Sequence, residues 1–325
     1  EILMDPCTQT FLGAAVSSSF SNKDEFKKAS LFGAIGGIVP DLDVFINSSE
    51  DQLLFIEYHR HFSHSLFFIP LGGLIISSIC FLIFKSKISF INTYLYCTLG
   101  IATHGLLDSC TTYGTSLYWP FSDLRIAWGI ISIIDPIFTL ILLFFLIFLF
   151  FKKSVSIIRF GLAFSLIYIF LGFQKNLEVK SFITQIAKNR GHKIERLMVN
   201  PTIGNIILWR TLYKSENKYY IDAVYMPFIS QPKIKKGVSL DVLDKDTIFP
   251  ILGSDSKQRN DIRRFSYFTD DYIYLHPNNE FLIGDLRYGT LPHDNQSLWG
   301  IEIDIKNPDG HVNFKNLRNF DDKVY

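Results

Sequence analysis

Histidine and aspartate residues gather at a few places in the first half of this chain of 325 residues, at spacings that could hold a metal ion. The groups are PDLD at 40–43, YHRHFSHSL at 58–66, HGLLD at 104–108 and a polar, aromatic segment at 111–128. A lone histidine or a lone DxD has a simpler explanation, as an interfacial hydrogen-bonding residue or a capped turn. Four such groups in a chain with 8 histidines favour a metal site. Imidazole and carboxylate ligands suit zinc or a similar divalent ion.

The apolar segments between these groups predict a membrane domain. A helix needs roughly 20 apolar residues to cross a bilayer. The segments that reach or approach this length are 66–84, 88–107, 136–151 and 155–173. Two shorter stretches, 8–20 and 29–39, are rich in glycine, alanine and serine, which allow close helix packing. We therefore expect a mainly α-helical polytopic domain with about four spanning helices and a short N-terminal helical hairpin.

Short basic loops set the expected orientation of these helices. Lys85 and Lys87 follow the first long segment, and Lys152 and Lys153 follow the third. Such loops stay in the cytoplasm. The opposite helix ends, which carry the histidines and aspartates, should face outward together with the chain that follows residue 173.

Local helix signals distinguish expected ligands from expected capping residues. Ser63 is expected to cap a helix that begins at His64, where the positive helix end would favour a neutral, metal-binding imidazole. Asp5 and Asp135 each precede a proline, which is typical of an N-cap followed by proline in the first turn. Arg159 lies inside the fourth apolar segment, and no sequence feature identifies its partner.

Composition agrees with a membrane protein and argues against a nucleic-acid binder. Hydrophobic residues make up 48% of the chain, and the formal net charge is +1. A nucleic-acid binder would carry a basic excess. The four cysteines form no CxxC pair and are expected to be small buried hydrophobic residues. Met4 is the expected natural start, without a cleavable signal peptide.

The more polar second half predicts a soluble domain of a different class. Alternating runs separated by turn residues predict antiparallel strands, and they include KYYIDAVYMPF, RRFSYFTDDYIYLHP, EFLIGDLRYGT and LWGIEIDIK. We expect a membrane-embedded domain at 1–175, a charged helical linker at 176–198 and an extracytoplasmic β-rich domain at 199–325. Asp285 and Arg287 are expected to form a cross-strand ion pair, with an arginine that binds an anionic substrate as the alternative.

The order and spacing of the motifs resemble a known family, the YdjM-like inner-membrane proteins of bacteria. These are described as membrane-bound metal-dependent hydrolases, some of them under LexA control. The matching stretches are MDPCTQTFLGAAV (4–16), GAIGGIVPDLDVFI (33–46), YHRHFSHSL (58–66), THGLLDSCTTYGTSLYWPFSDLRIAW (103–128) and IIDPIFTLILL (133–143). The resemblance implies a divalent-metal site with the ligands Asp41, Asp43, His59, His64, His104 and Asp108. His61 stands where the family usually has a small residue.

Together these features predict a multi-pass metalloenzyme of the bacterial inner membrane, with its site facing outward. We expect zinc as the ion, membrane lipid as a partner and a phosphoester or ester of a lipid-like molecule as the substrate. Asp41 or Asp43 would act as general base, and Arg60 or Arg125 would bind the phosphate.

The alternative is a non-catalytic membrane protein, with a structural metal site or a role in ion passage. Polar residues concentrate at one end of the expected helices, which favours the enzyme over an ion pathway. A fixed carboxylate partner for Arg60 would favour a structural role for that arginine.

Overall fold

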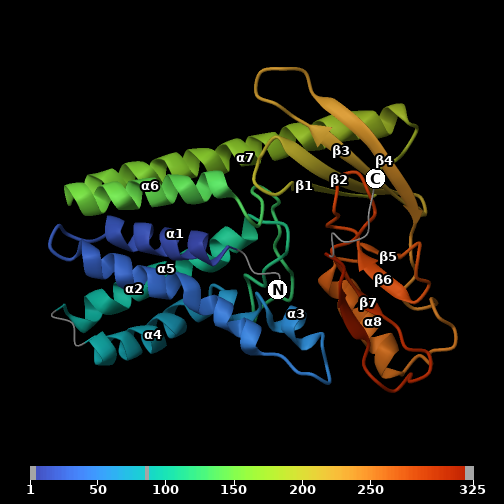
Figure 1. The fold of residues 1–325 in the computed structure, drawn as a ribbon, viewed down its shortest axis with the longest axis horizontal. Coiled ribbons are helices and arrows are strands. Elements are labelled where there is room, and N and C mark those ends of the chain that lie inside the picture. The colour runs from blue at the N-terminus through green and yellow to red at the C-terminus, as the bar shows by residue number, and fades with distance from the viewer. Residues whose placement is uncertain (1–4, 85–87, 319–325) are drawn as a thin grey trace. The chain divides into compact units, whose positions relative to one another are not determined.

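A helical first half is followed by antiparallel β-sheets, which confirms the coarse fold expected from the sequence. The structure is a computed structural model that describes residues 5–84 and 88–318. The expected start at Met4 and the basic loop at 85–87 lie outside these residues. The helices in chain order (Figure 1) are α1 (Pro6–Ser19), α2 (Phe26–Ile38), η1 (Val39–Phe45), α3 (Leu54–Tyr58), η2 (Phe62–His64), α4 (Phe68–Phe84), α5 (Phe90–Ser109), α6 (Pro136–Lys152) and α7 (Val155–Asn189), where η denotes a 3₁₀ helix.

The chain divides into two compact units. Unit 1 comprises the chain up to Phe45, Tyr58–Lys175 and Ile203–Ile206. Unit 2 comprises Ile46–Glu57, Asn176–Thr202 and the chain from Ile207 onward. Helix α7 continues without a break from the last apolar segment into the charged region that follows it.

One helix within the described ranges, α7, is long and apolar enough to cross a membrane by itself. A second span is possible if α4 counts together with the helical run Leu54–His64, which meets it at an angle of 87°. Helix α6 is apolar but has 17 residues. The structure therefore does not confirm the four spans expected from the sequence.

Small residues bring the first two helices into close contact, as the sequence predicted. Helices α1 and α2 pack against each other and against α5. The backbones of Gly13 and Gly33 approach so closely that a Cβ on either would collide with the carbonyl oxygen of the other. Ser18 Oγ and Ser30 Oγ are 2.6 Å apart and share a hydrogen bond.

Two helix caps predicted from Asp-Pro pairs are confirmed. Asp5 accepts a hydrogen bond from the Cys7 N–H at the start of α1, and Asp135 accepts one from the Phe138 N–H at the start of α6. The prediction for the cysteines was wrong at Cys7, which is exposed, whereas Cys80, Cys97 and Cys110 are buried. Cys7 lies in the first turn of α1, where few neighbours cover it.

The described part of unit 2 contains two antiparallel sheets of four strands, each in sequential order. One sheet consists of β1 (Arg196–Pro201), β2 (Leu208–Ser215), β3 (Lys218–Tyr225) and β4 (Lys233–Asp241). The other consists of β5 (Ile273–Leu275), β6 (Leu282–Asp285), β7 (Trp299–Glu302) and β8 (Asn313–Asn316).

Two local predictions for unit 2 need correction. The first part of the run RRFSYFTDDYIYLHP lies in helix α8 (Lys257–Phe268) and not in a strand. The hydroxyl of Ser256 caps this helix, and Ile262 and Phe265 are buried at helical spacing. Asp285 and Arg287 do form an ion pair of 2.8 Å, but the two residues lie two positions apart on the same segment, and not across strands.

Candidate metal centre

Short helical segments bring the polar motifs of unit 1 together. Asp41 and Asp43 lie in η1, which continues directly from α2. His64 lies in η2, and His104 and Asp108 lie in the last turns of α5. The expected cap by Ser63 is not present, because α4 begins only at Phe68 and the Ser63 hydroxyl donates to Asp43 instead.

Ligand atoms from four side chains converge on one buried point. They belong to Asp41, His64, His104 and Asp108, and all lie within 4.8 Å of one another. His64 Nε2 is 3.2 Å from Asp108 Oδ2 and 3.6 Å from Asp41 Oδ1. His104 Nε2 is 3.3 Å from Asp41 Oδ1 and 3.7 Å from Asp108 Oδ2. Ligands held about 2.0–2.1 Å from a tetrahedral zinc ion are about 3.3 Å apart, so the spacing fits such an ion.

These converging atoms have no hydrogen-bond partner within residues 5–84 and 88–318, and of the four Asp108 Oδ2 also has an arginine, Arg60, as an ion-pair partner. Asp41 Oδ1, His64 Nε2, His104 Nε2 and Asp108 Oδ2 are all buried and unpaired in this sense. Buried polar atoms without a partner are rare and costly. A cation bound at their common point would satisfy all four.

Hydrogen bonds behind the two ligand histidines select the tautomer that metal binding requires. His104 Nδ1 donates to the carbonyl oxygen of Gly37 at 2.5 Å. His64 Nδ1 lies 3.1 Å from Asp43 Oδ2. With the proton on Nδ1, each ring presents the lone pair of Nε2 to the cluster.

Asp43 and His59, both expected to be ligands, lie outside the group of four. Asp43 accepts hydrogen bonds from the Ser63 hydroxyl at 2.6 Å and the Arg60 N–H at 3.1 Å, and pairs with His59 Nδ1 at 2.8 Å. Burial alone would raise the pKa of Asp43, but its contacts with His59 and His64 hold that pKa well below its usual range. Asp43 therefore serves to orient both imidazoles. His59 Nε2 is buried, with no hydrogen-bond partner among the residues described.

Arg60 has a fixed carboxylate partner. The side chain is fully buried, and its Nε lies 3.0 Å from Asp108 Oδ2. Its Nη1 donates to Thr111 Oγ1 at 2.9 Å, and the guanidinium lies 4.8 Å from the centre of the Tyr113 ring. Three carboxylates and one guanidinium leave the centre with a formal charge of −2, which a divalent cation would neutralise.

Arg125 lies near the Tyr113 ring as well. Its guanidinium is 5.6 Å from the centre of the Tyr113 ring, and its Nη2 donates to the Gly114 carbonyl oxygen at 2.7 Å. The side chain is half-buried. Of the two arginines predicted to bind substrate, Arg125 is therefore the one with the more accessible side chain.

Gln9 is a residue of the centre that the sequence analysis did not identify. It is fully buried on α1, and its Nε2 donates to Asp108 Oδ1 at 2.8 Å. This bond holds the oxygen of Asp108 that is not directed at the cluster. The sequence signal was a single glutamine in a helix made mostly of small and apolar residues. A lone glutamine does not indicate that its partner lies 99 residues further along the chain.

A glycine allows η2 to reach α5. A Cβ at Gly105 would collide with the carbonyl oxygen of His64. We expect Gly105→Ala to displace His64 from His104 and Asp108, and so to weaken metal binding by about tenfold or more, in line with losses after ligand misalignment. Metal content of the purified variant would test this. Gly253→Ala is the control, because a Cβ there meets nothing within 4 Å; equal metal content in both variants would contradict the expectation.

A second group of acidic and histidine residues lies in unit 2 and has a different character. Asp51, Asp261 and His311 lie close together. Arg264 pairs with both aspartates, with Nη1 at 3.0 Å from Asp51 and 2.8 Å from Asp261. The guanidinium takes the place that a cation would fill, so this cluster is an ion-pair network.

Comparisons with known proteins agree with the membrane setting of the cluster. A model of the YdjM inner membrane protein family matches residues 4–179, which include every residue of the cluster. The chain is 31% identical over 101 residues to the uncharacterized protein YfhP of Bacillus subtilis, covering 31% of this chain and 30% of that protein. It is 31% identical over 107 residues to the inner membrane protein YbcI of Escherichia coli, covering 31% of this chain and 60% of YbcI. The similarity thus spans less than two thirds of either relative. No solved structure matches the chain.

Proposed function

The chain belongs to the YdjM inner membrane protein family, and from this we propose that it is a membrane-bound, metal-dependent hydrolase. Its substrate would be a phosphoester or ester of a lipid-like molecule at the membrane surface. The observation that carries the proposal is the convergence of four buried ligand atoms, none of which has a hydrogen-bond partner among the described residues.

The donor set indicates how the ion would be held. Asp41, His64, His104 and Asp108 would bind it, with Asp43 and the Gly37 carbonyl orienting the histidines. Two imidazoles and two carboxylates suit zinc best among common divalent ions. When bound, such an ion polarises a phosphoryl or acyl oxygen and makes water acidic enough to act as a nucleophile near pH 7.

His59 is better placed than Asp41 or Asp43 to move a proton. Both oxygens of Asp43 accept hydrogen bonds, and Asp41 belongs to the converging group. His59 pairs with Asp43 through Nδ1, and its Nε2 has no hydrogen-bond partner among the described residues. The centres of the His59 and His64 rings are 5.9 Å apart. A base whose far side is held by a carboxylate is the usual arrangement for general base catalysis.

Arg125 would meet the anionic group of the substrate. We expect Arg125→Ala to keep the fold and the metal but to lower hydrolysis about 100-fold or more, because a cation facing developing charge stabilises the transition state. The measurement is turnover on a panel of phospholipids and phosphodiesters, with metal content and melting temperature measured on the same samples. Arg318→Ala in unit 2 is the control. Wild-type protein that carries metal but cleaves nothing on the panel would contradict the hydrolase.

A structural metal site is the second candidate, and one observation favours it. All four converging ligands are protein side chains, and all are buried. Structural zinc sites are closed in this way, whereas catalytic zinc keeps a position for water or substrate. Metal-dependent stability without turnover would support this candidate.

We propose an inner-membrane location with several spans and with the metal centre facing outward. Lys152 ends α6, and Lys28 lies near the start of α2, so one end of the helices in unit 1 is basic, as the positive-inside rule requires of a cytoplasmic end. A cysteine replacing Lys152 should be shielded from an impermeant thiol reagent in intact cells, and one replacing Ser254 should be labelled. The background must lack the native cysteines, since Cys7 is exposed; the reverse labelling pattern would invert the orientation.

A further inference from the structure

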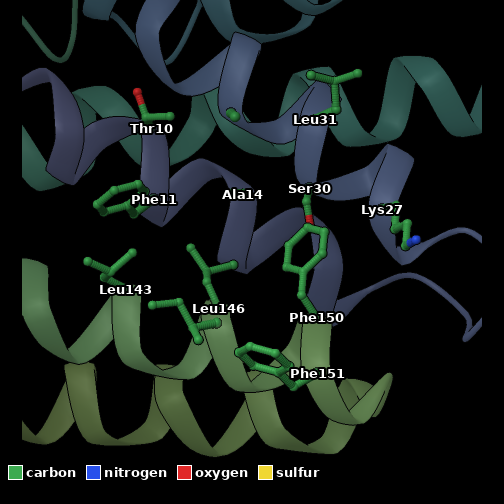
Figure 2. A pocket seen from close by; sticks show the side chains of 12 residues that line it. Thr10, Phe11, Ala14, Lys27, Ser30, Leu31, Leu143, Leu146, Phe150 and Phe151 are labelled. Carbon is green, nitrogen blue, oxygen red and sulfur yellow. The ribbon is translucent and has the colours of Figure 1, made fainter.

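Unit 1 has an apolar groove that is lined by none of the four converging residues. It has a volume of about 600 Å³ and lies between α1, α2 and α6. Figure 2 shows Leu143, Leu146, Phe150 and Phe151 of α6 facing the side chains of α1 and α2 across it. The lining residues are Thr10, Phe11, Ala14, Lys27, Ser30, Leu31, Ala34, Leu143, Leu146, Ile147, Phe150 and Phe151.

The groove has a basic end. Among the described residues that line it, Lys27 is the charged one, and it lies toward Phe150 and Phe151 (Figure 2). The rings of Phe26 and Phe150 are 5.5 Å apart, which brings the start of α2 to the end of α6. Lys28 follows Lys27, and Lys152 and Lys153 follow the end of the groove on α6. Asp24 and Glu25 precede α2, but Glu25 already accepts hydrogen bonds from Asn92 and Tyr96.

We infer that this groove binds one acyl chain of an anionic phospholipid, whose headgroup contacts Lys27. In a membrane, water does not fill an apolar groove, so hydrocarbon must. Along α6 the lining runs from Leu143 to Phe151, about 12 Å at 1.5 Å per residue. The apolar length suits an acyl chain, and the lysines at one end suit a negative headgroup.

The walls indicate that the groove is open to the bilayer and not part of the protein core. Leu31, Ile147 and Phe150 remain 42%, 44% and 44% exposed. Small residues, Ala14, Ser30 and Ala34, leave the space between the larger side chains. This inference is independent of the proposed hydrolase, because no residue of the metal centre lines the groove.

Lipid binding to the purified full chain tests the inference. The protein is extracted in mild detergent, stripped of lipid and titrated with phosphatidylglycerol or phosphatidylcholine under native mass spectrometry. We expect one phosphatidylglycerol per chain at concentrations where phosphatidylcholine does not bind. Lys27→Glu should weaken this binding by about tenfold or more, because it removes one attraction and adds one repulsion. Lys193→Glu, an exposed charge in unit 2, should leave it unchanged.

Two further variants test the groove itself. Ala34→Phe should fill it and abolish binding, whereas Leu82→Phe, at a side chain 74% exposed on α4, should not. If Ala34→Phe does not fold, Phe150→Trp serves instead. Brominated phosphatidylglycerol in the groove should quench its fluorescence more than that of the wild type, whose four tryptophans do not line the groove. Equal binding of the two lipids, unchanged binding in folded Ala34→Phe, or quenching no greater than in the wild type would each overturn the inference. So would a dimer of the wild type that only Ala34→Phe disrupts, because a second copy would then occupy the groove.

Discussion

Replacing Arg60 by alanine is expected to lower the free energy of unfolding by about 3–5 kcal/mol, the cost of breaking a buried ion pair by removing one partner. The side chain is fully buried, and its Nε lies 3.0 Å from Asp108 Oδ2. Without it, Asp108 loses the arginine with which it forms an ion pair. The loss should be partly reversed in Arg60→Lys, which keeps the charge but not the guanidinium contacts with Thr111 and Tyr113.

The measurement is unfolding in mixed detergent micelles, with metal content measured in parallel. Arg159→Ala is the matched control, because Arg159 also lies in the helical half but donates to a backbone carbonyl, that of Ser19, at 3.0 Å. Its removal should cost much less. If Arg60→Ala were as stable as the wild type and lost only turnover, Arg60 would act on the substrate, as the sequence analysis allowed, and the ion pair with Asp108 would not be a stabilising contact.

Replacing both His64 and His104 by alanine is expected to reduce the metal content to background. These rings supply two of the four converging atoms, and the remaining carboxylates, Asp41 and Asp108, would be left as two like charges. Replacing Asp43 by asparagine should be milder, with metal affinity lowered about 10–100-fold, because Asp43 orients His64 without joining the group of four.

Metal content after gel filtration provides the measurement for these variants. The control is the double variant His276→Ala, His293→Ala, which removes two histidines from unit 2 and should keep the metal. Full metal occupancy in His64→Ala, His104→Ala would show that the ion binds elsewhere. An Asp43→Asn variant as poor in metal as the double variant would make Asp43 a ligand itself.

The parts of the structure that depend on neighbouring residues followed from the sequence. The caps at Asp5 and Asp135 were predictable because the cap and the N–H groups it binds lie within three residues. The pairing of His104 with Asp108 on one face was predictable from helical periodicity. Convergence of the polar motifs followed from placing all of them at one end of the helices.

The parts that depend on distant contacts did not follow. The sequence could not separate the four converging residues from Asp43 and His59. Asp43 lies two positions after Asp41, and at that spacing an aspartate can either bind the metal or accept a hydrogen bond from a histidine. Gln9 reaches Asp108 only through the packing of α1 on α5. The sequence of helix α8 also fits a strand, because its aromatic residues follow an alternating pattern, and Ser256 is one of several polar residues before it that could cap a helix.

The central claim is that Asp41, His64, His104 and Asp108 form one metal site, and X-ray absorption spectroscopy of the purified wild-type protein tests it most directly. We predict one divalent ion per chain, with four nitrogen or oxygen neighbours at about 2.0–2.1 Å and outer-shell scattering from two imidazole rings. A protein that contains no stoichiometric metal, and takes up none when zinc, manganese or iron is supplied, would contradict the claim. A sulfur neighbour would contradict it equally, since no cysteine belongs to the cluster.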